Sequence, residues 1–170
     1  MNNISPSPIN RRTFIATTAA AGTFTLLRPA TAFGAEASTT IELGLIGCGG
    51  RGKWIAELFA QSGKYKFVAC ADYFQDKVDA AGDQFKIERA RRYTGLSGYK
   101  QLLASKLDAV VIETPPYFHP EQAAAAVEAG KHVFLAKPIA VDVPGCLTIA
   151  KAGKLATEKK VEHAKEAKLP

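Results

Sequence analysis

One stretch of the sequence constrains the fold more than any other: an apolar run over residues 41–46 ends in a glycine-rich turn and opens into a helix-like pattern. The turn reads G-x-G-x-x-G, with its glycines at Gly47, Gly49 and Gly52. Such glycines allow, in order, a sharp turn out of a strand, close approach of backbone to a pyrophosphate, and tight packing of the next helix. Unpaired N–H groups at the start of that helix then face the phosphates. Alone, the motif leaves a dinucleotide site and an ordinary turn equally open, because glycine-rich turns are common.

The first 37 residues are predicted to be a twin-arginine signal peptide and linker, not part of the fold. Arg11 and Arg12 precede an Ala/Thr-rich apolar run, and residues 30–32 offer an A-x-A cleavage site. The run is shorter than the roughly 20 residues that span a bilayer. We therefore expect export through the twin-arginine translocase to the periplasm or cell envelope, with a disordered basic leader or a cytosolic tail as the alternative.

The rest of the chain is long enough for one domain with its own core, but not for two. We expect this domain over residues 38–157. Residues 158–170 are a charged tract rich in Ala, Lys and Glu, which either extends the last helix or stays disordered.

Charge and cysteines exclude several classes of function. The formal net charge is +6, and the densest basic spot, three arginines within residues 89–92, has no aromatic residues interleaved in a repeating way. We expect a solvated turn there and no nucleic-acid partner. Cys48, Cys70 and Cys146 are odd in number and lack metal-ligand spacing, and two lie in or beside apolar strands. They predict buried free thiols rather than a disulfide framework, and no metal site.

Strand-like and helix-like segments alternate along residues 41–157, which is typical of a parallel sheet with helices on both faces. The continuous apolar run within residues 108–113 suits a strand buried on both faces. In the first helix, four large apolar residues recur at helical spacing on one face: Trp54, Ile55, Leu58 and Phe59. Strands are expected over residues 41–46, 65–71, 90–93, 108–113 and 132–135, and helices over residues 51–62, 75–85, 99–105, 120–129 and 143–157. The pattern predicts a doubly wound α/β domain of the Rossmann type.

Asp72 is the second candidate site residue. It follows the second expected strand, 25 positions after Gly47, where a carboxylate accepts hydrogen bonds from the adenosine ribose hydroxyls. Because the next three residues include no arginine, a 2′-phosphate would meet a carboxylate without an obvious cation. NAD is therefore favoured over NADP, although Lys77 keeps NADP open. An Asp that only begins a turn is the structural alternative.

Two later segments complete the candidate site. Thr114 and two prolines leave the carboxyl end of a central strand, where open α/β sheets bind ligands. His119, a few residues later, either contacts a cofactor or helps to cap the next helix. Lys137 ends another strand, where a cation near developing negative charge can take part in proton transfer; a solvated lysine is the ordinary alternative.

These segments, in this order, resemble the N-terminal half of the glucose-fructose oxidoreductase, inositol dehydrogenase and MocA-like (Gfo/Idh/MocA) family, over about residues 41–157. The matching residues are Gly47, Gly49, Gly50, Arg51, Gly52, Asp72, Thr114, Pro115, Pro116, His119, the run Gly130-Lys131-His132-Val133, Lys137 and Pro138. The resemblance implies a Rossmann domain that binds NAD or NADP at the glycine-rich turn and Asp72. It also implies that Thr114, Pro116 and His119 line the cofactor cleft, with Lys137 near the nicotinamide and substrate.

The family implies an oxidoreductase that transfers hydride to or from hydroxyl-bearing carbons of sugars, cyclitols or related compounds. A twin-arginine leader is similar to that of exported family members. Two departures stand out: the usual Glu-Lys-Pro is Ala136-Lys137-Pro138 here, and the second α/β domain that forms the substrate wall does not follow. We therefore expect a truncated form, whose polyol or sugar substrate binds only if a second domain or chain is supplied.

Two other functions remain open from the sequence. The chain is alternatively a non-catalytic dinucleotide-binding module. A transferase that uses S-adenosylmethionine is less favoured, because it leaves the Thr-Pro-Pro loop and Lys137 unexplained. Apolar surface uncovered at the sheet edge or cleft predicts self-association.

Overall fold

The computed structural model describes residues 40–166, with side chains for residues 40–159. The predicted signal peptide and the last residues of the charged tract lie outside this range. The strands are β1 (Ile41–Ile46), β2 (Tyr65–Asp72), β3 (Arg92–Thr94), β4 (Ala109–Ile112) and β5 (His132–Leu135). The helices are α3 (Gly50–Gln61), α4 (Gln75–Gln84), α5 (Gly98–Ala104), α6 (His119–Glu128) and α7 (Val143–Glu166), with a 3-10 turn, η1 (Arg89–Arg91).

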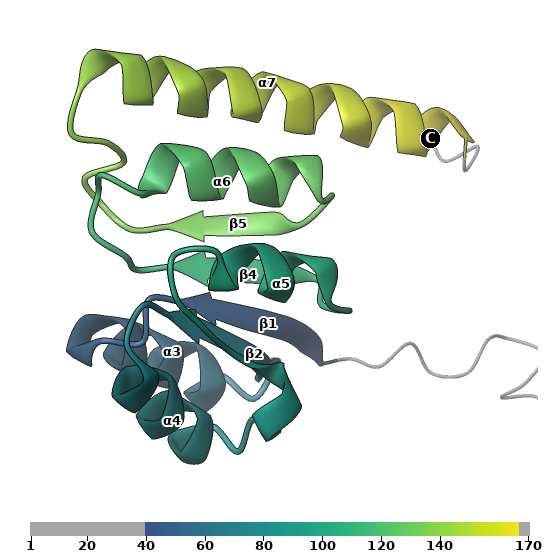
Figure 1. Cartoon of the computed structure of the whole chain (residues 1–170). Coiled ribbons are helices and arrows are strands. Elements are labelled where there is room, and N and C mark those ends of the chain that lie inside the picture. Colours follow the sequence, from purple (N-terminus) through teal and green to yellow (C-terminus); the bar gives the residue numbers. More distant parts are fainter. Residues whose placement is uncertain (1–39, 167–170) are drawn as a thin grey trace, which may run out of the picture. The chain divides into compact units, whose positions relative to one another are not determined.

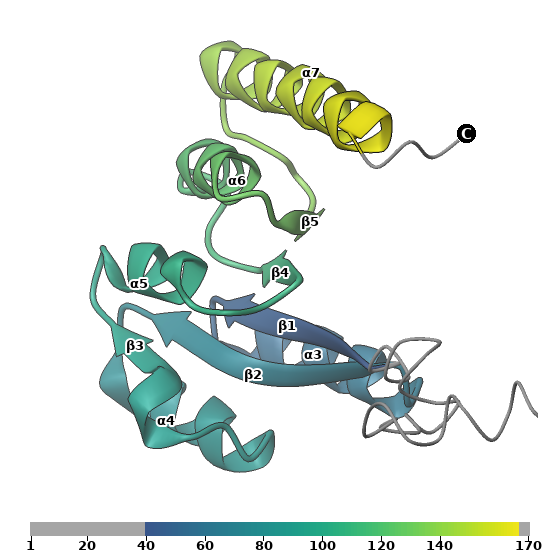
Figure 2. The same ribbon diagram turned by 90° about the vertical axis from the view of Figure 1, so that its right-hand side faces the viewer.

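The strands form one parallel sheet in the order β3-β2-β1-β4-β5 (Figures 1 and 2). The chain builds outward from β1 to β3 and then crosses to β4 on the other side of β1. Ile46, the last residue of β1, is aligned with Ala71 of β2 and Ile112 of β4. The loops after these three strands therefore emerge together at one edge, and the predicted doubly wound parallel sheet is confirmed.

Helices cover both faces of the sheet and enclose two apolar cores. The neighbours Leu45 and Ile46 belong to different cores, because successive strand side chains point to opposite faces. One core contains Ala56 of α3 and Val78 of α4, and the other contains Leu102 of α5. Full burial of each large aliphatic side chain contributes about 1.5–3 kcal/mol. On the outer side, α7 packs against α6 (Figure 1).

Helix α3 lies closer to the sheet than its large apolar residues suggested. Its buried positions are Gly52 and Ala56, and a Cβ on Gly52 would overlap the carbonyl oxygen of Gly47. This close approach excludes bulky side chains from the sheet-facing stripe. Trp54 and Leu58 consequently face solvent, with 54% and 48% of their surface exposed, so the four predicted residues do not form one buried face.

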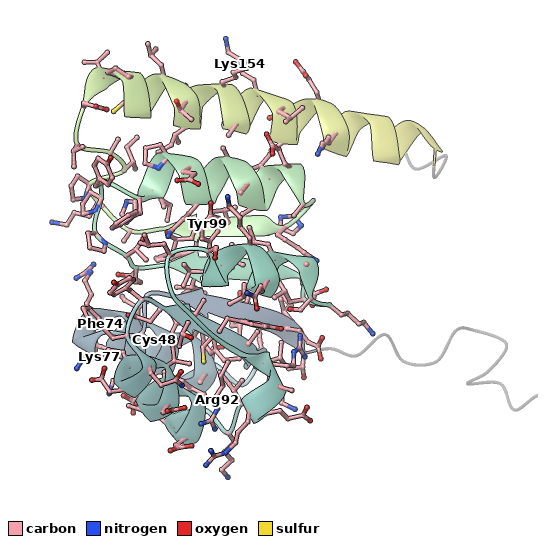
Figure 3. The ribbon with its side chains drawn as sticks, in the orientation of Figure 1. Cys48, Phe74, Lys77, Arg92, Tyr99 and Lys154 are labelled. Atoms are coloured by element: carbon pink, nitrogen blue, oxygen red, sulfur yellow. The ribbon has the colours of Figure 1, made fainter. Side chains whose placement is uncertain are left out.

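The predicted solvated turn at residues 89–92 is wrong for Arg92. Its side chain is 8% exposed and ion-pairs with Asp83 at 2.8 Å, while its Nε donates to the carbonyl of Ile87 at 2.9 Å (Figure 3). The residues before it form η1, so β3 begins two residues later than predicted. The guanidinium thus joins α4 to the short strand β3 instead of facing an external partner.

The cysteines and the last helix complete the comparison with the sequence. All three cysteines are free; Cys48 and Cys70 are buried as predicted, whereas Cys146 is exposed on α7. Helix α7 continues past residue 157 to Glu166, so the first part of the charged tract is a helical extension. Among the described residues, no helix combines the length and apolar character needed to cross a membrane.

Candidate functional site

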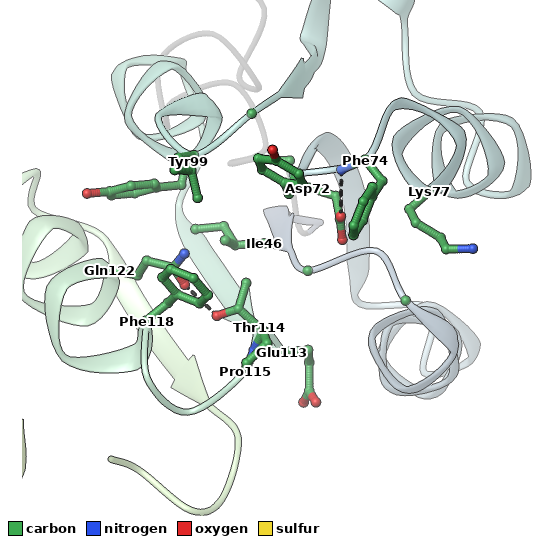
Figure 4. A pocket seen from close by; sticks show the side chains of 16 residues that line it. Ile46, Asp72, Phe74, Lys77, Tyr99, Glu113, Thr114, Pro115, Phe118 and Gln122 are labelled. Atoms are coloured by element: carbon green, nitrogen blue, oxygen red, sulfur yellow. Dashed lines mark hydrogen bonds between the residues drawn. The ribbon is translucent and has the colours of Figure 1, made fainter. Parts of the chain in front are cut away.

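A cavity of about 650 Å³ opens at the carboxyl ends of β1, β2 and β4 (Figure 4). We call it the strand-end cavity. Its walls come from the loops after these strands and from α5 and α6. It is lined by Ile46, Gly47, Gly49, Ala71, Asp72, Tyr73, Phe74, Lys77, Gly95, Leu96, Tyr99, Glu113, Thr114, Pro115, Phe118 and Gln122.

The glycine-rich turn forms one wall and has the geometry that its spacing predicts. Gly47 has a positive φ of 96°, and a Cβ there would lie 2.7 Å from the carbonyl carbon of Glu113. Gly49 precedes α3 without a side-chain cap, and the first turn of α3 carries no acidic residue. No atom lies within 4 Å of a Cβ built on Gly49 or Gly50. The N–H groups at the start of α3 therefore face open space that suits an anion.

Asp72 lies at the end of β2 and lines the same cavity. Its Oδ2 accepts a hydrogen bond from the backbone N–H of Cys48 at 2.7 Å, and its Oδ1 accepts one from Phe74 at 3.0 Å. These bonds fix the orientation of the carboxylate and tie it to the glycine-rich turn. Each oxygen keeps a lone pair for a further donor, as two ribose hydroxyls require.

The wall beyond Asp72 is apolar with one cation. Tyr73 and Phe74 are largely exposed, and their rings meet edge to face with centroids 4.9 Å apart. Leu96 and Tyr99 line the facing side. Lys77 also reaches the cavity and ion-pairs with the exposed Asp76 at 3.1 Å. This wall therefore offers flat apolar surface for an aromatic base, with a carboxylate and an ammonium group close by.

Glu113 was missed by the sequence reasoning. It follows the last residue of β4, its side chain is 1% exposed, and its Oε2 accepts a hydrogen bond from Arg51 Nε at 3.1 Å. Burial raises its pKa, while Arg51 and His119 act in the opposite direction. The available signal was an acidic residue ending an otherwise apolar strand, directly before the Thr-Pro-Pro loop.

His119 is buried and is not among the residues that line the strand-end cavity. The side chain is 1% exposed, and its two ring nitrogens lie 2.7 Å from the carbonyl oxygen of Thr114 and 3.0 Å from that of Pro138. The ring thus joins the loop after β4 to the segment after β5. Thr114 Oγ1 donates to Gln122 Oε1 at 2.6 Å, which fixes the same loop to α6.

The structure brings only some of the predicted site residues to the cavity wall. Gly47, Gly49, Asp72 and Thr114 line it. Five predicted residues and Lys137 are outside the lining: Gly50, Arg51, Gly52, Pro116 and His119. Lys137 is exposed just beyond β5, and its neighbour Pro138 is the residue that His119 contacts. The roles of these residues toward a cofactor stay predictions.

Comparison with protein families decides the assignment. Residues 41–163 match the family described as "Oxidoreductase family, NAD-binding Rossmann fold" (Gfo/Idh/MocA). The chain belongs to this family. Within the Gfo/Idh/MocA family it is similar to an inositol 2-dehydrogenase/D-chiro-inositol 3-dehydrogenase of Shouchella clausii, with 31% identity over 66% of this chain and 32% of the relative. It is also similar to an alpha-N-acetylgalactosaminidase of Shewanella oneidensis, with 32% identity over 64% of this chain and 25% of the relative.

Solved structures give the same result. The WlbA dehydrogenase from Bordetella pertussis, in complex with NADH and UDP-GlcNAcA, matches 69% of this chain and 35% of its own, with a TM-score of 0.62 and 31% identity. The myo-inositol 2-dehydrogenase from Lactobacillus plantarum matches 68% of this chain and 33% of its own, with a TM-score of 0.60 and 27% identity. The chain spans about a quarter to a third of the length of the relatives it matches. It contains the NAD-binding Rossmann domain of a Gfo/Idh/MocA oxidoreductase.

Proposed function

We propose that the strand-end cavity binds NAD in preference to NADP, for hydride transfer to or from a hydroxyl-bearing carbon of a sugar, cyclitol or related compound. The observation that carries this proposal is the oriented carboxylate of Asp72, whose two oxygens are held by Cys48 and Phe74 beside the open start of α3. A carboxylate accepts from two ribose hydroxyls but repels a 2′-phosphate. Lys77 reduces that repulsion and keeps NADP as the competing ligand.

The residues present fit a nicotinamide dinucleotide. The uncapped N–H groups after Gly49 suit a diphosphate, and the aromatic wall at Tyr73 and Phe74 suits an adenine ring. When bound, the nicotinamide supplies the hydride chemistry. The chain itself binds and orients the dinucleotide and excludes water from it. Lys137 is proposed to place a cation near the reacting oxygen.

Calorimetric titration of the full chain with NAD, NADP and S-adenosylmethionine tests the ligand. We expect NAD to bind more tightly than NADP, and S-adenosylmethionine not to bind. Tighter NADP binding would overturn the cofactor preference, and binding of S-adenosylmethionine alone would favour a transferase. Absorbance at the reduced-nicotinamide band during incubation with a polyol panel then separates turnover from the alternative, binding without catalysis.

Turnover of a substrate is expected to need a second domain or chain in addition to the Rossmann domain. The aligned segment covers only 25% and 32% of two of the relatives that it matches, and Lys137 is exposed rather than enclosed. We therefore expect turnover only when a second domain or chain covers the nicotinamide end of the cavity. Mixing the chain with a full-length relative carrying an inactive Rossmann domain tests this, because restored hydride transfer would show that a substrate wall can be supplied in trans.

Export is a separate proposal. The support is the order Arg11-Arg12, a weakly apolar run and an A-x-A site before the folded domain. The twin-arginine route also suits a protein that binds its cofactor before it crosses the membrane. When residues 1–37 are fused to a reporter that is active only in the periplasm, we expect reporter activity, and we expect R11K/R12K to abolish it. Unchanged reporter activity in R11K/R12K would argue for another export route.

A further inference from the structure

Glu113 has a feature that the fold alone does not account for. Its side chain is 1% exposed. Among the described residues, its Oε1 is the only buried side-chain nitrogen or oxygen atom that has no hydrogen-bond partner. Leaving a charged buried oxygen unpaired costs more than about 1–3 kcal/mol. A position that carries this cost at the wall of a ligand cavity is a candidate for a functional charge.

The surroundings of Glu113 leave its charge only partly balanced. Arg51 contacts Oε2, but 56% of the Arg51 side chain is exposed, so solvent screens much of its charge. His119 is the other basic side chain near the carboxylate, and both of its ring nitrogens already face backbone carbonyls. The glycine-rich turn lies against Glu113: Cβ atoms built on Gly47 and Gly52 would come within 2.7 Å and 3.4 Å of its atoms.

The strand order assigns Glu113 to one half of a bound dinucleotide. A dinucleotide lies across the point where the order reverses, and Asp72 at the end of β2 marks the adenosine side. Glu113 follows β4, on the opposite side of the turn after β1. This step rests on the proposed function. The carboxylate therefore faces the nicotinamide half, while Arg51 offsets its repulsion of the diphosphate.

We propose that the Glu113 carboxylate makes this site select the oxidised form of its nicotinamide dinucleotide over the reduced form. The oxidised ring carries a positive charge and the reduced ring carries none, while the rest of the dinucleotide is unchanged. A fixed negative charge beside the ring therefore stabilises only the oxidised form. Near a protein surface, opposite unit charges several ångströms apart change an equilibrium constant by about tenfold or more. Because Arg51 neutralises part of the Glu113 charge, we expect the oxidised form to bind about three- to tenfold more tightly than the reduced form.

Binding to the full chain at pH 8 tests the proposal, with dissociation constants for NAD⁺ and NADH measured by calorimetry. The quantity compared is the ratio of the NADH constant to the NAD⁺ constant. In E113Q this ratio should fall by about three- to tenfold. The matched control is E57Q, which alters an exposed carboxylate on α3 outside the cavity lining, and should leave the ratio unchanged. An unchanged ratio in E113Q, with both forms still bound, would overturn the proposal.

A second variant keeps the test independent of E113Q folding. R51Q removes the partner of Glu113 and leaves its carboxylate in place, so any loss of diphosphate contact weakens both forms alike. The ratio should rise above that of the wild type, and a fall would overturn the proposal. Failure of the proposed function has a different signature, because then the wild type binds neither NAD⁺ nor NADH.

Discussion

At the scale of single residues, the cavity contains two carboxylates, Asp72 and Glu113, whose surroundings differ. Asp72 is held by two backbone N–H groups and ends β2, whereas Glu113 is buried beside β4 with one oxygen unpaired. The first is ready to accept hydrogen bonds, and the second supplies charge without a full set of partners. Their effects on ligand binding and on stability should therefore differ in kind.

Replacing Asp72 should weaken NAD binding more than NADP binding. D72N keeps one oxygen but loses the charge that strengthens bonds from the ribose hydroxyls, so we expect a rise of about tenfold in the NAD dissociation constant. The NADP constant should change less, because its 2′-phosphate no longer faces a negative charge. Calorimetry measures both, with E88Q as an exposed control. Equal weakening of the two cofactors would show that Asp72 only shapes the turn.

Removing the charge of Glu113 should stabilise the chain at neutral pH. Burial raises the pKa of Glu113 above its ordinary 4.5, so between that value and the raised pKa the folded state binds more protons than the unfolded state. Stability from this group is therefore full below 4.5 and is lost as pH rises through the raised pKa. We expect E113Q to increase the free energy of unfolding by about 1 kcal/mol at pH 7, with the gain shrinking toward pH 4.

Urea titrations at several pH values measure this difference. A destabilised E113Q at pH 7 would mean that the bond to Arg51 contributes more than burial of the carboxylate costs.

At the scale of the elements, the distance between α3 and the sheet decides which side chains fit. Gly52 lies against the carbonyl of Gly47, and this approach turns Trp54 and Leu58 to solvent. The same approach holds the start of α3 beside Gly49, the residue before the helix, which lines the cavity. Packing of the helix and formation of the site therefore depend on one glycine.

Substitution of Gly52 should be strongly destabilising. In G52A the new methyl overlaps the Gly47 carbonyl, so the helix must move away, and we expect a loss of about 2 kcal/mol or more. The matched control is G153A in α7, where no atom lies within 4 Å of the new Cβ. There alanine should stabilise by about 0.5–1 kcal/mol, since glycine is unfavourable inside a helix. Thermal unfolding of both variants checks the contrast.

The features predicted well from the sequence are those set by local chemistry. The bounds of β1, the turn at Gly47 and the place of Asp72 follow from an apolar run, a glycine spacing and a strand end. Burial of Arg92 and exposure of Trp54 could not be predicted, because each depends on how closely a helix approaches the sheet. The contacts of Glu113 and His119 join segments far apart in the sequence, and no periodicity encodes them.

At the scale of the whole molecule, the described unit has apolar side chains left uncovered near one sheet edge. β5 pairs only with β4 among the described strands, and the segment after it exposes Ile139, Val141, Val143 and Leu147. Exposed apolar residues this close together on a small domain promote association.

The chain should self-associate in a concentration-dependent way. V143K/L147K places two charges on this surface and should reduce the apparent mass toward that of one chain, without lowering the melting temperature, since both side chains are largely exposed. Light scattering coupled to gel filtration measures the mass over a range of concentrations. A monodisperse monomer at every concentration would contradict the expectation.

The buried thiol next to the first glycine has a practical consequence. Cys48 directly follows Gly47, and the neighbouring Cys70 thiol together with burial raises the pKa of Cys48, whereas Cys146 is exposed. An alkylating reagent should modify Cys146 at once and reach Cys48 only during transient opening of the turn. The slow phase of such labelling would report the opening frequency of the phosphate-facing loop, and a bound nucleotide should lengthen it.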